Sequence, residues 1–236
     1  MRRELTRSSS VVKIGATAAF FALLLTGCQV SNAGLATIVG SGEIVTQERV
    51  VEKFHKIRVG SALDAVIVHG DEQSVSVTAD DNVVDKIETV VAINGALVVR
   101  RADGLKLHTK SPIRLRIVTP VCDSVVVSGG SEVSLKEFTQ KEFRTKVTEA
   151  SKFTLDSQID HLELQASGAS KVYADHHESK TVDIDLSGAS QVSLSAADTI
   201  EGTIAGASSV TYSGDPNDVA IKTTGSSRVR RQKSES

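Results

Sequence analysis

The sequence feature that most constrains the fold is a short motif that recurs six times in the C-terminal half. Each copy has a serine preceded by Gly, Ala or Ser, and a Val or Phe two residues after that serine. A nearly constant period of this kind is typical of repeat folds, in which each unit stacks on the next. The repeated serines are Ser131, Ser151, Ser170, Ser190, Ser208 and Ser227, at steps of 20, 19, 20, 18 and 19 residues.

Short alternating segments flank each serine and predict β-strands. Val182–Leu186 reads Val-Asp-Ile-Asp-Leu before Ser190, and Val192–Leu194 reads Val-Ser-Leu after it. Alternation of apolar and polar residues directs one set of side chains inward and the other into water. A unit of about 19 residues cannot bury its own apolar face, but a stack of such units can. The signature of leucine-rich repeats is missing, so the sequence predicts an all-β fold, a β-helix (β-solenoid) with coils of about 19 residues.

The N-terminal half is also rich in strand-forming residues, without the strict motif. His69-Gly70-Asp71 and Asn94-Gly95 indicate turns, and residues 81–90 predict either one short helical turn or more coil. No linker composition separates the halves, so one continuous solenoid over residues 41–232 is expected, with 233–236 as a tail. The expected strands are Lys56–Val59, Ala65–His69, Val75–Thr78, Leu97–Arg101 and Ile113–Thr119.

The first 27 residues have the pattern of an export signal. Four basic residues and one Glu precede an apolar run from Ile14 to Thr26. A bilayer span needs about 20 apolar residues, so this run is too short, whereas a secretory signal has this charge pattern and length. Leu25-Thr26-Gly27-Cys28 at its end resembles the bacterial lipobox, which predicts a signal peptide over 1–27 and a lipidated Cys28.

A lipidated Cys28 places the protein in the cell envelope. Residues 28–40 are then expected to be the linker that follows the anchor, and several acyl chains on one cysteine exceed what stable membrane binding requires. Asp at the position after the cysteine retains such lipoproteins at the inner membrane in enterobacteria-like cells. Gln29 stands there instead, so the outer membrane is the expected location.

Charge and cysteine content exclude some classes of protein. The whole chain has 27 basic and 29 acidic residues, and residues 1–27 hold four of the basic and one of the acidic. The remainder has 23 against 28, a formal net charge of −5, which argues against nucleic-acid binding. Cys122 is the only cysteine besides Cys28, so lipidation removes its disulfide partner, and a buried, inert thiol is expected at Cys122.

The chain resembles a bacterial family described as putative auto-transporter adhesin, head GIN domain. The resemblance covers about residues 40–230, and its most specific part is the repeated Ser-Gly-Ala-Ser. It implies a single-stranded, right-handed parallel β-helix on an exported protein, often one with a lipoprotein signal, and it brings no catalytic residues. The matching segments are Phe54–Gly60, Asp64–Gly70, Ile93–Leu97, Ser167–Val172 and Ser187–Val192.

An outward-facing acidic column is the main candidate site. When the repeats are aligned, Glu163, Asp183 and Glu201 occupy equivalent positions, and Arg144 occupies that position one coil earlier. Like charges on neighbouring strands are unfavourable, so the column indicates either a bound cation or ligand or a solvated face, with the solvated face favoured. Asp185 extends the same face.

Other reactive groups favour structural interpretations. The serine column lacks a recurring His or Asp that could activate a nucleophile. Residues 175–178 (Asp-His-His-Glu) hold four metal-ligand types, but adjacent residues seldom point at one ion. Asp183 and Asp185 are about 7 Å apart along one strand face, a separation that some glycosidases use, without any other feature of such an enzyme. The sequence therefore predicts no catalytic residue, metal site or cofactor.

Three functions are consistent with these features. We expect a non-enzymatic, envelope-anchored binding or adhesion module, held to the membrane by its N-terminal lipid, whose partner is a polysaccharide or another envelope protein. The alternatives are a polysaccharide-degrading β-helix enzyme and a structural or sensory envelope component.

Overall fold

The computed structural model describes residues 36–232, which form seventeen strands and one helical turn. The expected all-β class is confirmed. Within this range, no helix is both long and apolar enough to cross a membrane. In chain order the elements are β1 (Ala36–Val39), β2 (Ile44–Glu48), β3 (Lys56–Val59), β4 (Asp64–His69), β5 (Ser74–Asp80), α1 (Asp81–Val84), β6 (Ile87–Val91), β7 (Ala96–Arg101), β8 (Leu105–His108), β9 (Arg114–Thr119), β10 (Ser124–Val127), β11 (Glu132–Val147), β12 (Lys152–Ala166), β13 (Lys171–Leu186), β14 (Gln191–Ile204), β15 (Ser209–Ser213), β16 (Asp218–Thr223) and β17 (Arg228–Arg231).

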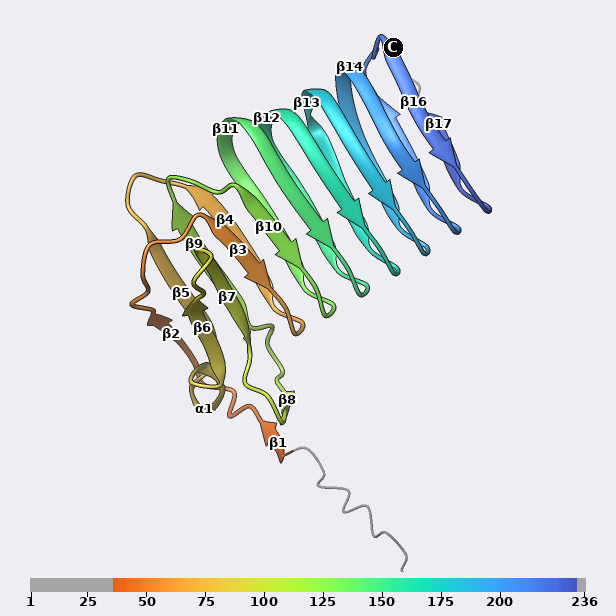
Figure 1. Cartoon of the computed structure of the whole chain (residues 1–236). Helices are drawn as coiled ribbons and strands as arrows, with labels where there is room; N and C mark the ends of the chain where they lie inside the picture. The colour runs from red at the N-terminus through yellow and green to blue at the C-terminus, as the bar shows by residue number, and fades with distance from the viewer. Residues whose placement is uncertain (1–35, 233–236) are drawn as a thin grey trace, which may run out of the picture. The chain divides into compact units, whose positions relative to one another are not determined.

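The strands of the C-terminal half lie side by side in parallel (Figure 1). β11, β12, β13 and β14 pair in that order, β15 and β16 pair with different parts of β14, and β17 pairs with β15. The apolar residue after each repeated serine marks the register. These residues form one column across the strands, in the order Val133, Phe153, Val172, Val192, Val210 and Val229.

Each of the long strands β11 to β14 alternates buried and exposed residues and bends in its middle. The register of the pairing between β11 and β12 shifts between Lys136 and Thr139 of β11, which marks a bulge. The hydroxyl of Ser157 accepts a hydrogen bond from the Phe138 amide there, at 3.2 Å. Bulges bend a strand and leave one residue out of the ladder, and the long strands are visibly curved (Figure 1).

Tight turns that contain the repeated serines connect successive long strands. Ser170 and Ser190 are fully buried. Their hydroxyls donate to the carbonyls of Ser167 and Ser187, at 2.7 and 2.9 Å. Backbone bonds also link one turn to the next, since the Ala189 amide donates to the Gly168 carbonyl at 2.7 Å. The serine column is therefore structural, as the sequence predicted.

The N-terminal half departs from the expected continuous parallel stack. β3 and β10 pair in parallel, as do β4 and β11, so both halves belong to one 15-stranded sheet. However, β2 pairs with β5, β5 with β9 and β6 with β7 in antiparallel fashion. Turns reverse the chain here, and the Gly95 amide donates to the Ala92 carbonyl at 2.9 Å between β6 and β7. Without the repeat motif, no fixed period forces each strand to lie parallel to the last.

The N-terminal part of the described range contains a strand where a linker was expected, and one short helical turn. Residues 36–39 were expected to belong to a linker, but they form β1, which pairs in parallel with β8. The two together are a separate two-stranded sheet. Residues 81–84 form α1, the short helical turn that was one of two alternatives.

The core is a continuous layer of aliphatic side chains with a few Phe residues. Phe143 and Phe153 are almost fully buried and stack with ring centroids 6.1 Å apart. Cys122 is also buried, as expected. Loss of hydration disfavours a thiolate there and raises the pKa of Cys122 to about 12, with a smaller contribution from the charge of Asp123. An inert thiol follows from these surroundings.

Candidate functional site

The acidic column forms in the register that the repeats predict. Glu163 on β12 pairs with Asp183 on β13, which pairs with Glu201 on β14. Asp185 lies two residues further along β13 and pairs with Thr203, whose hydroxyl donates to the Asp185 carboxylate at 3.1 Å. The structure therefore brings all four predicted residues onto one face of adjacent strands.

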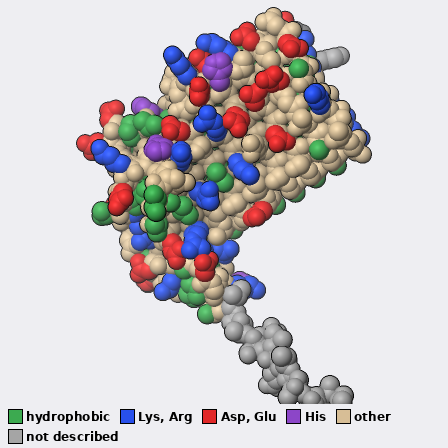
Figure 2. Space-filling model, in the orientation of Figure 1, with side chains coloured by type: hydrophobic (Ala, Val, Ile, Leu, Met, Phe, Trp, Pro, Cys, Tyr) green, Lys and Arg blue, Asp and Glu red, His purple; other side chains and the backbone are tan. Residues whose placement is uncertain are grey.

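Neighbouring side chains neutralise only part of this column. Arg144 lies directly before Glu163, and the Nε to Oε2 distance is 3.0 Å. At the other end, a hydrogen bond with Asp183, and then the charge of that carboxylate, raises the pKa of Glu201 above its ordinary value. Both ends are exposed, so solvent screens these interactions. Figure 2 shows acidic and basic side chains mixed on the strand face and a nearly uncharged surface where the tight turns lie.

The column is a weak candidate for a metal site. Glu163, Asp183 and Arg144 line a shallow hollow of about 290 Å³ together with His161 and Thr181. Among residues 36–232, no three His, Cys, Asp or Glu side chains are arranged to hold a metal ion. The hollow thus has acceptors for hydrogen bonds from a ligand and an arginine at one end.

The Asp-His-His-Glu segment lies in the bend of β13, and its side chains do not converge. His177 Nε2 lies 3.1 Å from Asp156 on the neighbouring strand. His176 instead contacts its neighbour Asp175, at 3.7 Å. These are two separate pairs at the surface.

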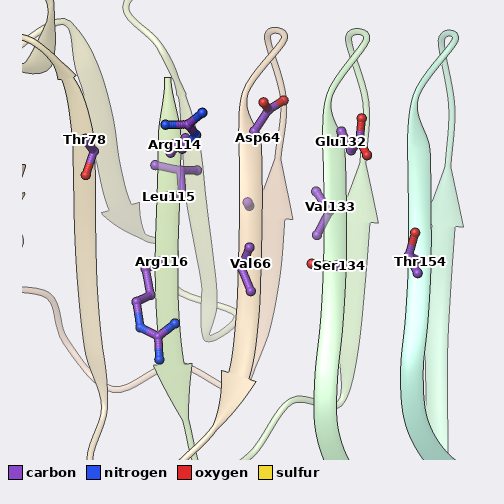
Figure 3. Close-up of a pocket in the computed structure, with 11 residues that line it drawn as sticks. Asp64, Val66, Thr78, Arg114, Leu115, Arg116, Glu132, Val133, Ser134 and Thr154 are labelled. Carbon is purple, nitrogen blue, oxygen red and sulfur yellow. The ribbon is translucent and has the colours of Figure 1, made fainter. Parts of the chain in front are cut away.

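A second site, which sequence reasoning missed, is a groove across five strands (Figure 3). It has a volume of about 390 Å³. The sheet order β5–β9–β4–β11–β12 places its residues side by side, although they come from distant parts of the sequence. The lining residues are Asp64, Ala65, Val66, Thr78, Arg114, Leu115, Arg116, Glu132, Val133, Ser134 and Thr154.

The outward side chains of the groove form two rows, which are two residues apart along each strand. In the first row, which is the charged row, Arg114 pairs with Asp64 and Asp64 with Glu132. In the second row, which we call the Arg116 row, Arg116 pairs with Val66, Val66 with Ser134 and Ser134 with Thr154. Figure 3 shows both rows at separate levels of the same face.

Charge is unevenly distributed between the two rows. Partial burial and the adjacent Glu132 raise the pKa of Asp64, and the guanidinium of Arg114 opposes this shift. Glu132 itself is paired with Lys152, at 2.7 Å. Within residues 36–232, the guanidinium of Arg116 has neither an ion pair nor a hydrogen bond, and its partner on β5 is the uncharged Ser76. No carboxylate of these residues therefore lies within ion-pair distance of this positive charge.

The groove escaped prediction because its strands are not repeats of one another. Arg114 and Arg116 alternate with apolar residues on β9, which indicates only that both face outward. Nothing in the sequence shows that β9 lies between β4 and β5.

Cys28, the predicted lipidation site, lies outside the described residues.

One comparison with known proteins identifies a family. Residues 53–216 match the family described as putative auto-transporter adhesin, head GIN domain. A comparison with curated protein sequences found no match.

Solved structures show the same fold. A putative adhesin from Bacteroides fragilis superposes with a TM-score of 0.71 at 16% identity, covering 83% of this chain and 100% of the other. A putative lipid binding protein from Parabacteroides distasonis (TM-score 0.55, 16% identity) covers 84% of this chain and 100% of its own. A putative adhesin from Parabacteroides merdae gives 0.55 at 14% identity, with 84% and 100% coverage. The match over most of the chain shows that the protein belongs to the family of putative auto-transporter adhesins with a head GIN domain.

Proposed function

We propose that this protein is an envelope-anchored lipoprotein whose strand stack is a non-catalytic adhesion module for polysaccharide. The observation that carries this proposal is the register of the stack. Parallel pairing from β11 to β17 aligns equivalent outward side chains in straight rows, in which successive side chains are about 4.8 Å apart. Straight rows of polar side chains suit a partner that is itself periodic, as a polysaccharide is.

The finer architecture follows from the same register. We infer that the C-terminal half coils as a single-stranded, right-handed parallel β-helix with about 19 residues in each coil. The steps of 18 to 20 residues between paired Val and Phe positions support this coil length. Right-handed crossovers between parallel strands are by far the commoner hand.

The envelope location rests on the sequence. Residues 1–27 are proposed to be a cleaved signal peptide, and Cys28 to bear the lipid, including palmitate, that binds the membrane. Gln29 supports the outer membrane, and membership of an adhesin family is consistent with a surface or envelope location. Growth of cells with an alkyne analogue of palmitate should label the wild type and leave Cys28→Ser unlabelled, while equal labelling of the two would contradict this anchor.

A binding role is favoured over catalysis by the state of the candidate groups. Five of the six repeated serines are buried, Asp185 accepts a hydrogen bond from Thr203, and Asp183 is next to Glu201. No aromatic side chain lines either described hollow except the buried Phe143. A polysaccharide-degrading enzyme would need Asp183 and Asp185 for activity. This alternative predicts that the protein releases reducing ends from a polysaccharide and that Asp183→Ala abolishes the release.

Binding should be tested with the chain from residue 29 onward, because the described residues 36–232 belong to one compact unit. We expect this chain to bind a subset of polysaccharides on a glycan array and to release no reducing ends from them. A chain unfolded in urea and dried on the same array serves as the control for nonspecific adsorption. The absence of binding to any glycan or to envelope polysaccharide extracts would contradict the proposed function. Capture of an envelope protein alone would favour the structural or sensory alternative.

A further inference from the structure

We propose that the groove of Figure 3 is a polysaccharide subsite at one end of the strand stack, and that it takes an acidic sugar whose carboxylate binds Arg116. This inference rests on the proposed adhesion to polysaccharide and names the class of ligand. The guanidinium of Arg116 has no ion-pair partner among the described residues and lies in the groove on the exposed face of β9. A guanidinium presents a planar set of donors that matches a carboxylate in two parallel hydrogen bonds.

The remainder of the Arg116 row has the chemistry of a sugar-binding surface. Val66, beside Arg116, is an exposed apolar side chain, with 37% of its surface accessible. Ser134 and Thr154 follow on the next two strands and carry hydroxyl groups. The row therefore places an anion-binding group, an apolar patch and two hydroxyl groups in a line. A chain of sugar acids offers carboxylates, C–H faces and ring hydroxyls to such groups.

The dimensions of the row suit a few linked sugars. Adjacent strands are about 4.8 Å apart, so Arg116 and Thr154 are separated by three strand spacings, or about 14 Å. Pyranose rings in an extended chain repeat at a distance close to one strand spacing. A groove of about 390 Å³ is within the ordinary range for small-ligand sites.

The charged row limits which anion can enter. Arg114 lies about 7 Å from Arg116 on the same strand face, but it is next to Asp64, and Glu132 follows. These carboxylates reduce the positive potential of the groove and repel a dianion more than a monoanion. A uronic acid, with one negative charge per sugar, is therefore favoured over a phosphorylated or heavily sulfated one. The same carboxylates can accept hydrogen bonds from sugar hydroxyls.

The test uses the chain from residue 29 and three probes in isothermal titration. The probes are an oligogalacturonate, the same oligosaccharide with its carboxylates methyl-esterified, and dextran sulfate. We expect binding of the oligogalacturonate, loss of binding for the ester, and weaker binding of dextran sulfate. Arg116→Gln should weaken oligogalacturonate binding by about tenfold or more, since a hydrogen-bonded ion pair is lost.

Arg58→Gln is the matched control, because Arg58 is an exposed arginine on β3 outside the groove. It should bind like the wild type. In the NMR spectrum, the methyl signals of Val66 and Thr154 should shift on addition of oligogalacturonate. Circular dichroism of Arg116→Gln should match that of the wild type, which separates lost binding from lost folding.

Several outcomes would overturn the inference. They are absence of oligogalacturonate binding, equal binding of the ester, tighter binding of dextran sulfate, and equal effects of the Arg116 and Arg58 substitutions. If the wild type binds only neutral polysaccharides on the array, the inference fails and the proposed adhesion stands. If it binds none, the proposed function fails as well.

Discussion

The turn at Gly188 offers the sharpest test of how the repeat units stack. Its φ is +76°, and a Cβ built on it would lie 2.6 Å from the carbonyl oxygen of Gly168 in the preceding turn. That same oxygen accepts a hydrogen bond from the Ala189 amide at 2.7 Å. Gly188→Ala therefore imposes an unfavourable backbone conformation and also pushes apart two hydrogen-bonded turns.

The size of the loss follows from three contributions. An L side chain in the left-handed region costs about 1–2 kcal/mol. The lower entropy of Ala in the unfolded chain offsets about 0.4–1 kcal/mol of this. Overpacking against backbone adds about 1–3 kcal/mol. We expect Gly188→Ala to lower the free energy of unfolding by about 2–4 kcal/mol.

Two other glycines separate the conformational cost from the packing cost. Gly104 has nearly the same φ, +75°, but a Cβ there would meet no atom within 4 Å. Gly168 has φ +76° and a nearest atom at 3.3 Å, the Glu149 amide nitrogen. We therefore expect Gly104→Ala to cost about 1 kcal/mol, Gly168→Ala somewhat more, and Gly188→Ala the most.

The measurement is urea unfolding at equilibrium of the chain from residue 29, followed by far-ultraviolet circular dichroism. Repeat proteins can unfold in parts, so the slope of free energy against urea should be compared across the variants. Equal losses for Gly104→Ala and Gly188→Ala would refute the reasoning, because the close approach of the turns would then contribute nothing.

Three further predictions concern single side chains. Glu201→Gln should raise the melting temperature more at pH 7 than at pH 4. Asp183 raises the pKa of Glu201 in the folded state above its ordinary value of 4.5. The stability contributed by this group is therefore fully present below pH 4.5 and is lost as the pH rises through the folded-state pKa. An equal effect at both pH values would contradict this, and an NMR titration of the Glu201 carboxyl would measure the pKa directly. In the native chain from residue 29, Cys122 should resist a thiol reagent at pH 8, because burial raises its pKa to about 12. In urea, where the thiol is exposed, it should react at once. Rapid labelling of the native protein would show that Cys122 is accessible. Ser190→Ala should lower the free energy of unfolding by about 1–2 kcal/mol, because it removes a buried hydrogen bond to backbone. Ser227→Ala, at the exposed end of the same column, should change it by less than about 0.5 kcal/mol in urea unfolding, and similar losses at both sites would argue against burial as the cause.

The acidic column shows how much of a site a repeat sequence can specify. Glu163, Asp183 and Glu201 were aligned from the period alone, and the structure pairs them in that register. The period could not predict the contacts of each carboxylate, because these contacts depend on the conformations of long side chains at the surface. Arg144 binds Glu163, while Asp183 lies beside Glu201 and raises its pKa.

The sequence by itself determined the strand stack of the C-terminal half, its register and the structural role of the buried serines. Those features are local and repeated, so each unit provides the same information about its neighbour. Only the tertiary structure decided the antiparallel pairings of β2, β5 and β6 and the position of β9 between β4 and β5. Pairing between unlike strands depends on loop lengths and on packing across the whole sheet, which no short pattern contains. For that reason the sequence predicted the acidic column, and the groove at Arg116 emerged only from the fold.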